Sequence, residues 1–152
     1  MSNMYTETAF TIDTSSIKFG PGITKESGYE LSRLGATRVL VVTDPQLANS
    51  PAVQTAIDSL KQANIDYAVF DQVSVEPTDS SLKRAIKFAV EGNFDGFLPV
   101  GGGSSIDTAK AVNLYSTYPA EFLEYVNAPI GKGTPVPGDL KPLVAVPTTA
   151  GT

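Results

Sequence analysis

Three consecutive glycines, Gly101 to Gly103, mark the segment of this sequence with the clearest chemical potential. They follow the apolar run DGFLPV (95–100) and precede the stretch SSIDTAKAV, which has helical spacing. Glycines at a strand-to-helix turn let the backbone approach a phosphate closely, and the start of the helix adds free N–H donors and partial positive charge. Ser104 and Ser105 add hydroxyl groups. The turn alone leaves two interpretations open: a phosphate site, or a tight corner before a capped helix.

The glycine turn departs from the best-known phosphate motifs. Ile106 stands where the third glycine of G-x-G-x-x-G would be, and no Gly-Lys-Ser/Thr lies at the spacing of a Walker A loop. Lys110 lies too far past the glycines to serve as a P-loop lysine, so we expect it to be solvated. Ser104 and Asp107 have the spacing of a capping box, which assigns Asp107 a capping role.

Polar residues also follow two other apolar runs. Asp44 ends RVLVVTD (38–44) and could accept hydrogen bonds from a ribose diol or serve a turn before Pro45. Asp44 precedes the glycine turn, whereas the acid of the usual dinucleotide fingerprint follows by roughly 20 residues, which argues against the standard module. Thr148 and Thr149 follow LVAVP (143–147) and could bind a nucleotide or cap a turn.

Composition excludes several classes of chemistry. The 152 residues contain no His and no Cys, so no Ser-His-Asp triad or thiolate site can be built, and a metal would need carboxylates alone. The net charge of −5 argues against nucleic acid or an anionic membrane surface as a partner. No apolar run approaches the roughly 20 residues of a membrane helix. The first residues do not resemble a secretory signal or transit peptide, so we expect a cytoplasmic protein.

Apolar runs alternate with amphipathic stretches along the chain. We expect strands at SSIKFGPG (15–22), 38–44, 66–70, 95–100 and 143–147. We expect helices at 23–34 before Gly35, after Ser50-Pro51, after Thr78, at 105–114 and, as a short piece, at 120–125, with a surface loop at 127–142. This alternation predicts an α/β fold with a Rossmann-like, doubly wound, mostly parallel sheet, whose ligand loops lie at the carboxyl ends of the strands.

Taken together, the segments resemble the iron-containing (group III) alcohol dehydrogenase family. The resemblance is carried, in order along the chain, by VVTD, VEPTDSS, VGGGSSIDTAKAVNLY, APIGKGTPV and LKPLVAVPTTAGT. The stretches around 76–81 and 128–152 are most similar to the hydroxyacid–oxoacid transhydrogenase branch. The resemblance implies that residues 1–152 form an N-terminal, dehydroquinate synthase-like nucleotide-binding domain, and that a helical metal-binding domain follows in the longer family enzymes.

The resemblance also implies a role for individual residues. Asp44 matches the adenosine-ribose position and implies NAD rather than NADP, and Glu76 falls where many members carry Asn. The pyrophosphate loop is matched by Gly102, Gly103 and Ser104. The threonines beside the nicotinamide end are matched by Thr148, Thr149 and Thr152. The family's divalent metal, Fe or Zn, has its ligands beyond residue 152.

These matches imply the NAD-binding part of a metal-dependent oxidoreductase that moves hydride between an alcohol or hydroxyacid and its carbonyl. Two alternatives stay open: a stand-alone nucleotide-binding module without catalysis, and a dehydroquinate synthase-like lyase domain. Because the chain carries no clear metal cluster, we expect that by itself it binds cofactor weakly and does not catalyse hydride transfer. A missing partner domain would expose an apolar face, which favours association into a homo-oligomer.

Overall fold

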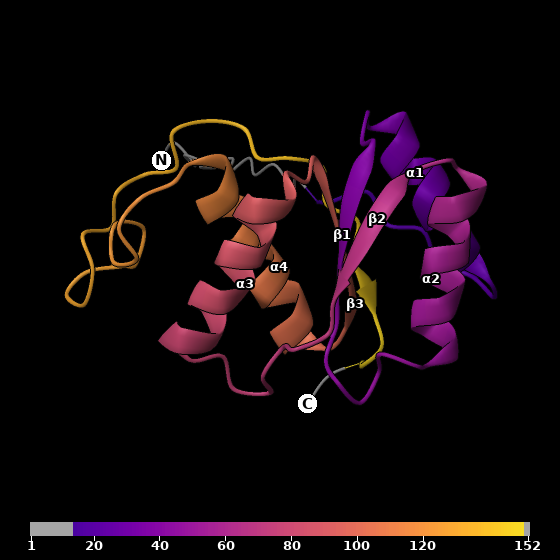
Figure 1. The fold of residues 1–152 in the computed structure, drawn as a ribbon, viewed down its shortest axis with the longest axis horizontal. Coiled ribbons are helices and arrows are strands. Elements are labelled where there is room, and N and C mark those ends of the chain that lie inside the picture. Colours follow the sequence, from indigo (N-terminus) through magenta and orange to yellow (C-terminus); the bar gives the residue numbers. More distant parts are fainter. Residues whose placement is uncertain (1–13, 151–152) are drawn as a thin grey trace, which may run out of the picture.

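Four parallel strands form the centre of the molecule, which a computed structural model describes for residues 14–150 (Figure 1). The strands are β1 (Arg38–Val42), β2 (Asp66–Phe70), β3 (Gly96–Gly101) and β4 (Val146–Pro147). Their order across the sheet is β2-β1-β3-β4, with every pairing parallel. The predicted doubly wound α/β fold is confirmed.

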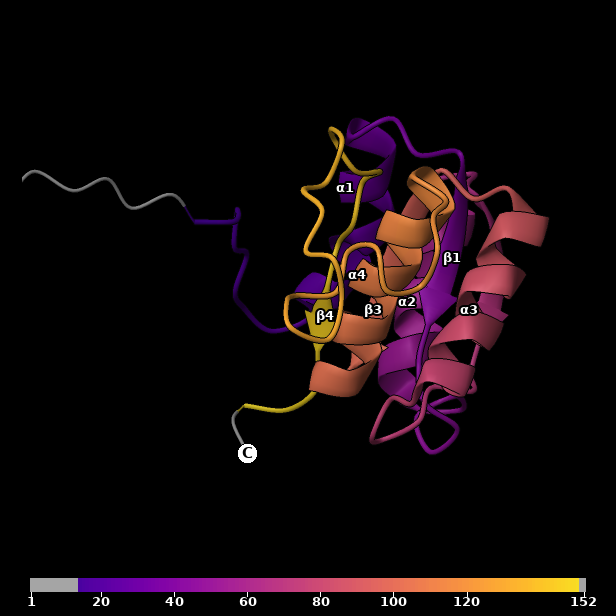
Figure 2. The same cartoon turned by 90° about the vertical axis from the view of Figure 1, so that its left-hand side faces the viewer.

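Helices cover both faces of this sheet. The 3-10 turn η1 (Ile23–Glu26), α1 (Ser27–Arg33) and α2 (Pro51–Gln62) lie on one face. On the other face lie α3 (Asp79–Gly92) and α4 (Gly103–Thr117), as the turned view in Figure 2 also shows. Three layers result, with the strands in the middle.

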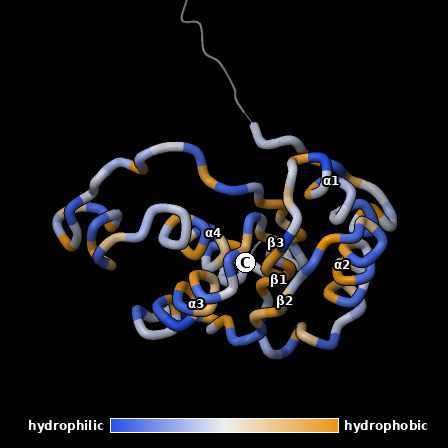
Figure 3. The backbone as a smooth tube through the Cα atoms, turned by 45° about the horizontal axis from the view of Figure 1, so that its top comes forward, coloured by the Kyte–Doolittle hydropathy of each residue, from blue (hydrophilic) through white to orange (hydrophobic). Residues whose placement is uncertain are grey.

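The two central strands are apolar because both of their faces are buried, over Val39–Val42 in β1 and along the whole of β3. Val39 and Val41 of β1 pack into one cluster with Leu60 of α2, whereas Leu40 and Val42 pack into a second cluster with helices α3 and α4. Figure 3 shows the strands as a hydrophobic centre between helices of mixed hydropathy. Burying one such Val or Leu side chain contributes about 1.5–3 kcal/mol.

Two of the predicted helix starts are confirmed in detail. The Ser50 hydroxyl accepts a hydrogen bond from the N–H of Val53 at 3.3 Å, and Pro51 occupies the first turn of α2. Thr78 and Ser81 form a reciprocal capping box at the start of α3. These helices therefore satisfy their first N–H groups with their own side chains.

Several predicted elements differ from the structure. Residues 15–22 form no strand, since they pair with no other strand within the described part of the chain and the Ile17 side chain is 80% exposed. The helix expected at 23–34 begins as a 3-10 turn, although Gly35 does end it with a φ of 89°. Residues 120–125 form turns instead of a helix, and the fourth strand shrinks to β4 plus a bridge between Leu143 and Phe97.

The predicted surface loop at 127–142 is confirmed, and Figure 2 shows it running outside α4. Its first part folds back on itself, because Lys132 donates its N–H to the Leu123 carbonyl at 2.9 Å. Over residues 14–150, the helices are too short or too polar to cross a membrane.

Candidate functional site

The carboxyl ends of the four strands bring the predicted site residues to one edge of the sheet. Asp44 follows β1, the glycine turn ends β3, and Thr148 and Thr149 follow β4. The Thr148 N–H donates to the Gly101 carbonyl at 2.9 Å. A Cβ atom at position 102 would lie 3.4 Å from Oγ1 of Thr149. Residues far apart in the sequence therefore form one surface at the carboxyl edge.

The strand order places a topological switch point inside this surface. From β1 the chain crosses to β2 on one side and then returns to β3 on the other side. In open α/β sheets, ligands bind in the crevice at the carboxyl ends of the strands where the order reverses. Asp44 on β1 and Gly101 on β3 flank this position.

The three glycines have different surroundings. A Cβ atom on Gly101 would lie 2.5 Å from Oγ of Ser105, so the fold itself requires glycine there. Gly102 has ordinary contact distances to Thr149, and a Cβ atom on Gly103 would meet no atom of the described residues within 4 Å. Packing against the described residues therefore does not require glycine at positions 102 and 103.

The start of α4 lacks a side-chain cap. Gly102 is the N-cap residue, no side chain of residues 14–150 caps it, and the first turn holds no acid. The expectation of a Ser104–Asp107 capping box is wrong, because β3 ends at Gly101 and the helix begins two residues earlier than predicted. The first N–H groups of α4 are left as donors beside a positive helix end.

The serines after the glycines have separate environments. The Ser104 hydroxyl donates to the carbonyl oxygen of Val75 at 2.5 Å, which joins the glycine turn to the loop between β2 and α3. Ser105 is 1% exposed, and its hydroxyl has no hydrogen-bond partner among the described residues. Nothing in the spacing of the sequence predicts that these two neighbours differ.

The Asp44 carboxylate is half-buried and held in a turn. Its Oδ1 accepts the N–H groups of Gln46 at 2.8 Å and Leu47 at 3.0 Å. This is the turn contact that the sequence offered as one interpretation. Its other oxygen makes no hydrogen bond within residues 14–150, so the turn and a ligand could share the group.

Thr43 links the ends of the two central strands, a contact that sequence reasoning missed. It is fully buried, its hydroxyl donates to the Val100 carbonyl at 2.8 Å, and its N–H donates to the Phe70 carbonyl at 2.9 Å. Its own carbonyl accepts the Val73 N–H at 3.3 Å. A Thr at the end of an otherwise apolar strand was the available signal, since a buried hydroxyl must find a partner.

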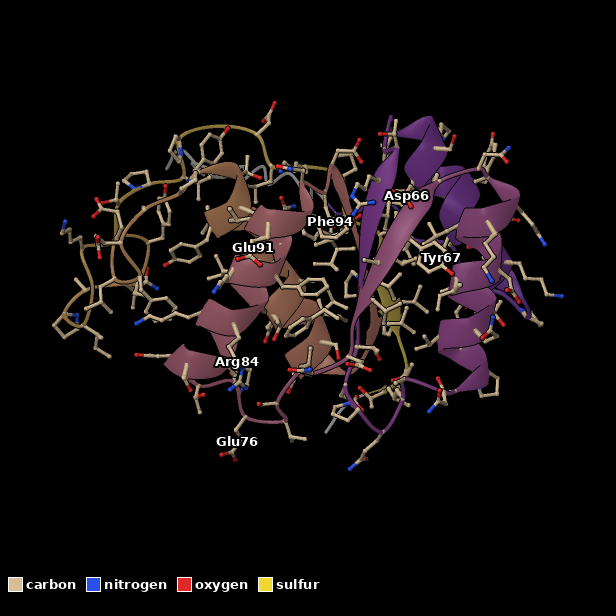
Figure 4. All side chains as sticks on the ribbon, viewed as in Figure 1. Asp66, Tyr67, Glu76, Arg84, Glu91 and Phe94 are labelled. Carbon is tan, nitrogen blue, oxygen red and sulfur yellow. The ribbon has the colours of Figure 1, made fainter. Side chains whose placement is uncertain are left out.

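The remaining candidates lie at the surface. Thr148, Thr149, Glu76 and Lys110 are exposed, as predicted for the lysine. Figure 4 shows Glu76 below α3, at the carboxyl end of the sheet. Thr152 lies outside the described residues.

No metal centre can be assembled from the part of the chain that the structure describes. Within residues 14–150 no three carboxylates come together, and the sequence holds neither His nor Cys. A hollow of about 420 Å³ lies between α3, α4 and residues 119–122, with Lys83, Glu91 and Phe122 in its lining. It contains none of the predicted site residues.

Comparison with known proteins supports the sequence resemblance. The chain is 55% identical over 152 residues to the mitochondrial hydroxyacid-oxoacid transhydrogenase of Bos taurus, a match that covers 99% of this chain and 33% of the bovine protein. It is 52% identical to the protein of the same name from Homo sapiens, with 99% and 32% covered. The chain therefore spans about a third of the length of these curated relatives.

The fold has a close counterpart among solved structures. The NADH-dependent butanol dehydrogenase A of Thermotoga maritima superimposes with a TM-score of 0.80 at 25% identity, over 95% of this chain and 35% of that one.

The predicted cytoplasmic location is wrong. The bovine and human relatives, which match along 99% of this chain, are both named as mitochondrial proteins. Location was inferred from the first residues alone, and those lack the Arg-rich composition of a transit peptide.

The sequence model of iron-containing alcohol dehydrogenase matches residues 14–152. Together with a parallel sheet whose glycine turn opens an uncapped helix, this match shows that the chain belongs to the iron-containing alcohol dehydrogenase family, a family of oxidoreductases.

Proposed function

We propose that residues 1–152 form the NAD(H)-binding domain of a metal-dependent oxidoreductase that acts on an alcohol or a hydroxyacid. The observation that carries this proposal is the uncapped N-terminus of α4 behind a bare glycine turn. Helices α2 and α3 begin at the same edge of the sheet, and both are capped by their own side chains. An anion such as pyrophosphate would satisfy the donors that α4 leaves free.

The arrangement across the sheet fits a dinucleotide. Asp44 on β1, the glycine turn on β3 and Thr149 after β4 lie in that order along the edge. Adjacent strands are about 4.8 Å apart, so this row extends about 10 Å. The adenosine ribose would lie at Asp44, the pyrophosphate at Gly102, Gly103 and Ser104, and the nicotinamide half toward Thr148, Thr149 and Thr152.

The cofactor supplies the chemistry of hydride transfer, and the protein's part is to bind and orient it. The Gly103 and Ser104 N–H groups would fix the phosphates, and the Asp44 carboxylate would accept ribose hydroxyls and repel a 2′-phosphate. Thr43 holds the ends of β1 and β3 together, which sets the distance between these two binding groups.

The described residues do not fit a metal ion, so no step that needs one is assigned to them. The family implies Fe or Zn, held by residues other than these. No His or Cys is present to move a proton from an alcohol. We therefore expect this chain by itself to bind NAD(H) weakly and to turn over no substrate.

The names of the relatives suggest the substrate and location. In a transfer between a hydroxyacid and an oxoacid, bound NAD⁺ would take a hydride from the hydroxyacid, and the resulting NADH would pass it to the oxoacid. The bovine relative is named as a mitochondrial protein. We extend both properties to the protein as part of this proposal. The family match favours this function over the lyase alternative.

The proposal is tested by titrating NADH into the 152-residue protein and following its backbone amide resonances by NMR, which detects binding even in the millimolar range. We expect the Gly103, Ser104 and Ser105 amides to shift, and NADH to bind more tightly than NADPH. Gly103→Val should weaken NADH at least about tenfold, because the side chain fills the open space at the turn.

Gly20→Val is the matched control, since its Cβ atom would also meet no described atom within 4 Å and it lies outside the site. Equal NADH affinity for the wild type and Gly103→Val, with the fold intact by circular dichroism, would overturn the pyrophosphate assignment. Absence of any shift in the wild type would overturn NAD(H) binding by this chain.

A further inference from the structure

We propose that the Ser104 side chain is a latch that holds the 71–77 loop against the glycine turn and so positions one wall of the cofactor site. The inference rests on the proposed function. It gives Ser104 two separate tasks: its N–H faces the site, and its hydroxyl bonds the carbonyl of Val75.

The 71–77 loop, which joins β2 to α3, is fixed at both ends. Val73 is 4% exposed, and its N–H donates to the Thr43 carbonyl at 3.3 Å. At the other end, Thr78 is held by the capping box of α3. These contacts position the ends of the loop but not its middle.

The middle of the loop has little else to hold it. The Val75 side chain is 77% exposed and Glu76 is exposed as well, so packing contributes little there. Within residues 14–150, residues 74–77 make one hydrogen bond, the bond of 2.5 Å from the Ser104 hydroxyl to the Val75 carbonyl. We infer that losing this bond releases the segment between Val73 and Thr78.

The position of the loop links it to one half of the dinucleotide. The loop follows β2, which lies beside β1 and on the far side of β1 from β3 and β4. Asp44 follows β1, so the loop borders the adenosine side of the proposed site. The pyrophosphate side depends on backbone N–H groups of α4, which a change of the Ser104 side chain leaves in place.

This separation gives the latch a specific signature. Ser104→Ala removes the hydroxyl and keeps the N–H, so binding of NADH should fall while binding of inorganic pyrophosphate stays unchanged. The expected loss for NADH is about threefold to tenfold, the range for one hydrogen bond. Ser104→Thr keeps a hydroxyl at the same place and should restore the affinity.

The experiment measures NADH and inorganic pyrophosphate binding by amide shifts in the wild type, Ser104→Ala and Ser104→Thr. Backbone ¹⁵N relaxation order parameters of residues 74–76 provide the second readout, and they should fall in Ser104→Ala alone. Urea unfolding of each variant separates these effects from a general loss of stability.

Each possible result either supports or overturns the latch. Wild-type protein that binds neither NADH nor pyrophosphate overturns the proposed function, and the latch with it. If the wild type binds NADH and Ser104→Ala binds it equally well, the latch is wrong while the proposed function stands. A parallel loss of NADH and pyrophosphate would place the Ser104 hydroxyl on the phosphate, which also overturns the latch.

Discussion

The amino and carboxyl edges of the sheet treat their polar groups in opposite ways. At the amino edge, the Asp95 carboxylate accepts the Thr37 N–H at 2.9 Å, the Thr37 hydroxyl at 2.5 Å and the Arg38 N–H at 2.8 Å. At the carboxyl edge, α4 begins without a side-chain cap from residues 14–150. The amino edge satisfies these donors internally, whereas the first N–H groups of α4 at the carboxyl edge are left free.

The amino edge extends this pattern through charged groups. The Arg38 side chain pairs with Asp66, donates Nε–H to the Gly92 carbonyl at 2.8 Å, and lies 4.9 Å from the centre of the Phe94 ring. Lys141 donates to the Phe94 carbonyl at 2.9 Å. Figure 4 shows Asp66 and Phe94 at this end of the sheet and Glu76 at the opposite end. The charges here join the starts of the strands to one another.

Small residues, Thr43 and the glycines at 101–103, end the two central strands at the carboxyl edge. Thr43, buried and bonded to Val100, keeps the strand ends in register without filling the space above them. Under the proposed function, the amino edge contributes stability and the carboxyl edge provides the donors for the cofactor. Free donors at a helix start lower the stability of the unliganded protein. An anion that binds there satisfies these donors, so its binding stabilises the folded state.

The largest effect on stability is expected from Asp95→Ala. The substitution leaves the N–H groups of Thr37 and Arg38 without their acceptor, so the free energy of unfolding should fall by about 2–3 kcal/mol. Urea unfolding measures it. Asp71→Ala at the carboxyl edge is the control, since Asp71 is exposed and its side chain has no hydrogen-bond partner among the described residues. A change within about 0.5 kcal/mol is expected there.

The Asp95→Ala variant also tests how the stability of the protein depends on pH. Burial acts to raise the pKa of Asp95, but hydrogen bonds from the Thr37 hydroxyl and from backbone N–H groups outweigh it, so the pKa is lowered overall. A carboxyl whose folded pKa lies below its unfolded value of about 3.9 stabilises the protein above that value. The stability difference between wild type and Asp95→Ala should therefore close as the pH falls below about 4. If the stability difference between wild type and Asp95→Ala stays the same at lower pH, the ionised Asp95 carboxylate is not the acceptor that stabilises this edge.

The sequence predicted best the features that depend on neighbours along the chain. The caps at Ser50 and Thr78 were correct because both partners lie within a few residues. Strand β2 matched its predicted bounds of 66–70, and positive φ at Asn64 marks the turn before it. The contact between Asp44 and the N–H groups after it was also anticipated as a turn.

Some features that depend on distant partners were missed. Residues 15–22 have strand-like composition, but within the described residues no strand lies beside them to accept their hydrogen bonds. Ser104 was predicted to cap its own helix, yet its hydroxyl bonds Val75, 29 residues away in the sequence. Spacing alone could not reveal that α4 begins at Gly103, two residues before the predicted start.

Gly103→Asp at the carboxyl edge should have two smaller effects of opposite sign: a gain in stability and a loss of NADH affinity. The new carboxylate faces open space at the start of α4, where negative charge stabilises a helix by about 0.3–1 kcal/mol. The same charge should repel a pyrophosphate and weaken NADH at least about tenfold. Urea unfolding and NADH titration measure the two effects. Gly103→Asn is the matched control, because it has nearly the same shape without the charge. An unchanged NADH affinity in Gly103→Asp would show that the free donors do not bind the cofactor's phosphates, and a stability below that of Gly103→Asn would contradict the favourable charge at the helix start.

The smallest effect is expected from Asp66→Asn, which tests whether the amino edge acts as one network. Arg38 and Asp66 are cross-strand partners at the starts of β1 and β2, and their side chains are 38% and 66% exposed. Solvent screens such a pair, so its loss should cost less than about 1 kcal/mol, and the difference should shrink further in roughly 1 M salt. Arg38 keeps its bond to the Gly92 carbonyl, and the Asn oxygen can still accept the Tyr67 N–H. Urea unfolding at low and high salt measures the difference from wild type. A cost equal to that of Asp95→Ala, and insensitive to salt, would mean that the amino edge is a single coupled network instead of one essential carboxylate with exposed ion pairs around it.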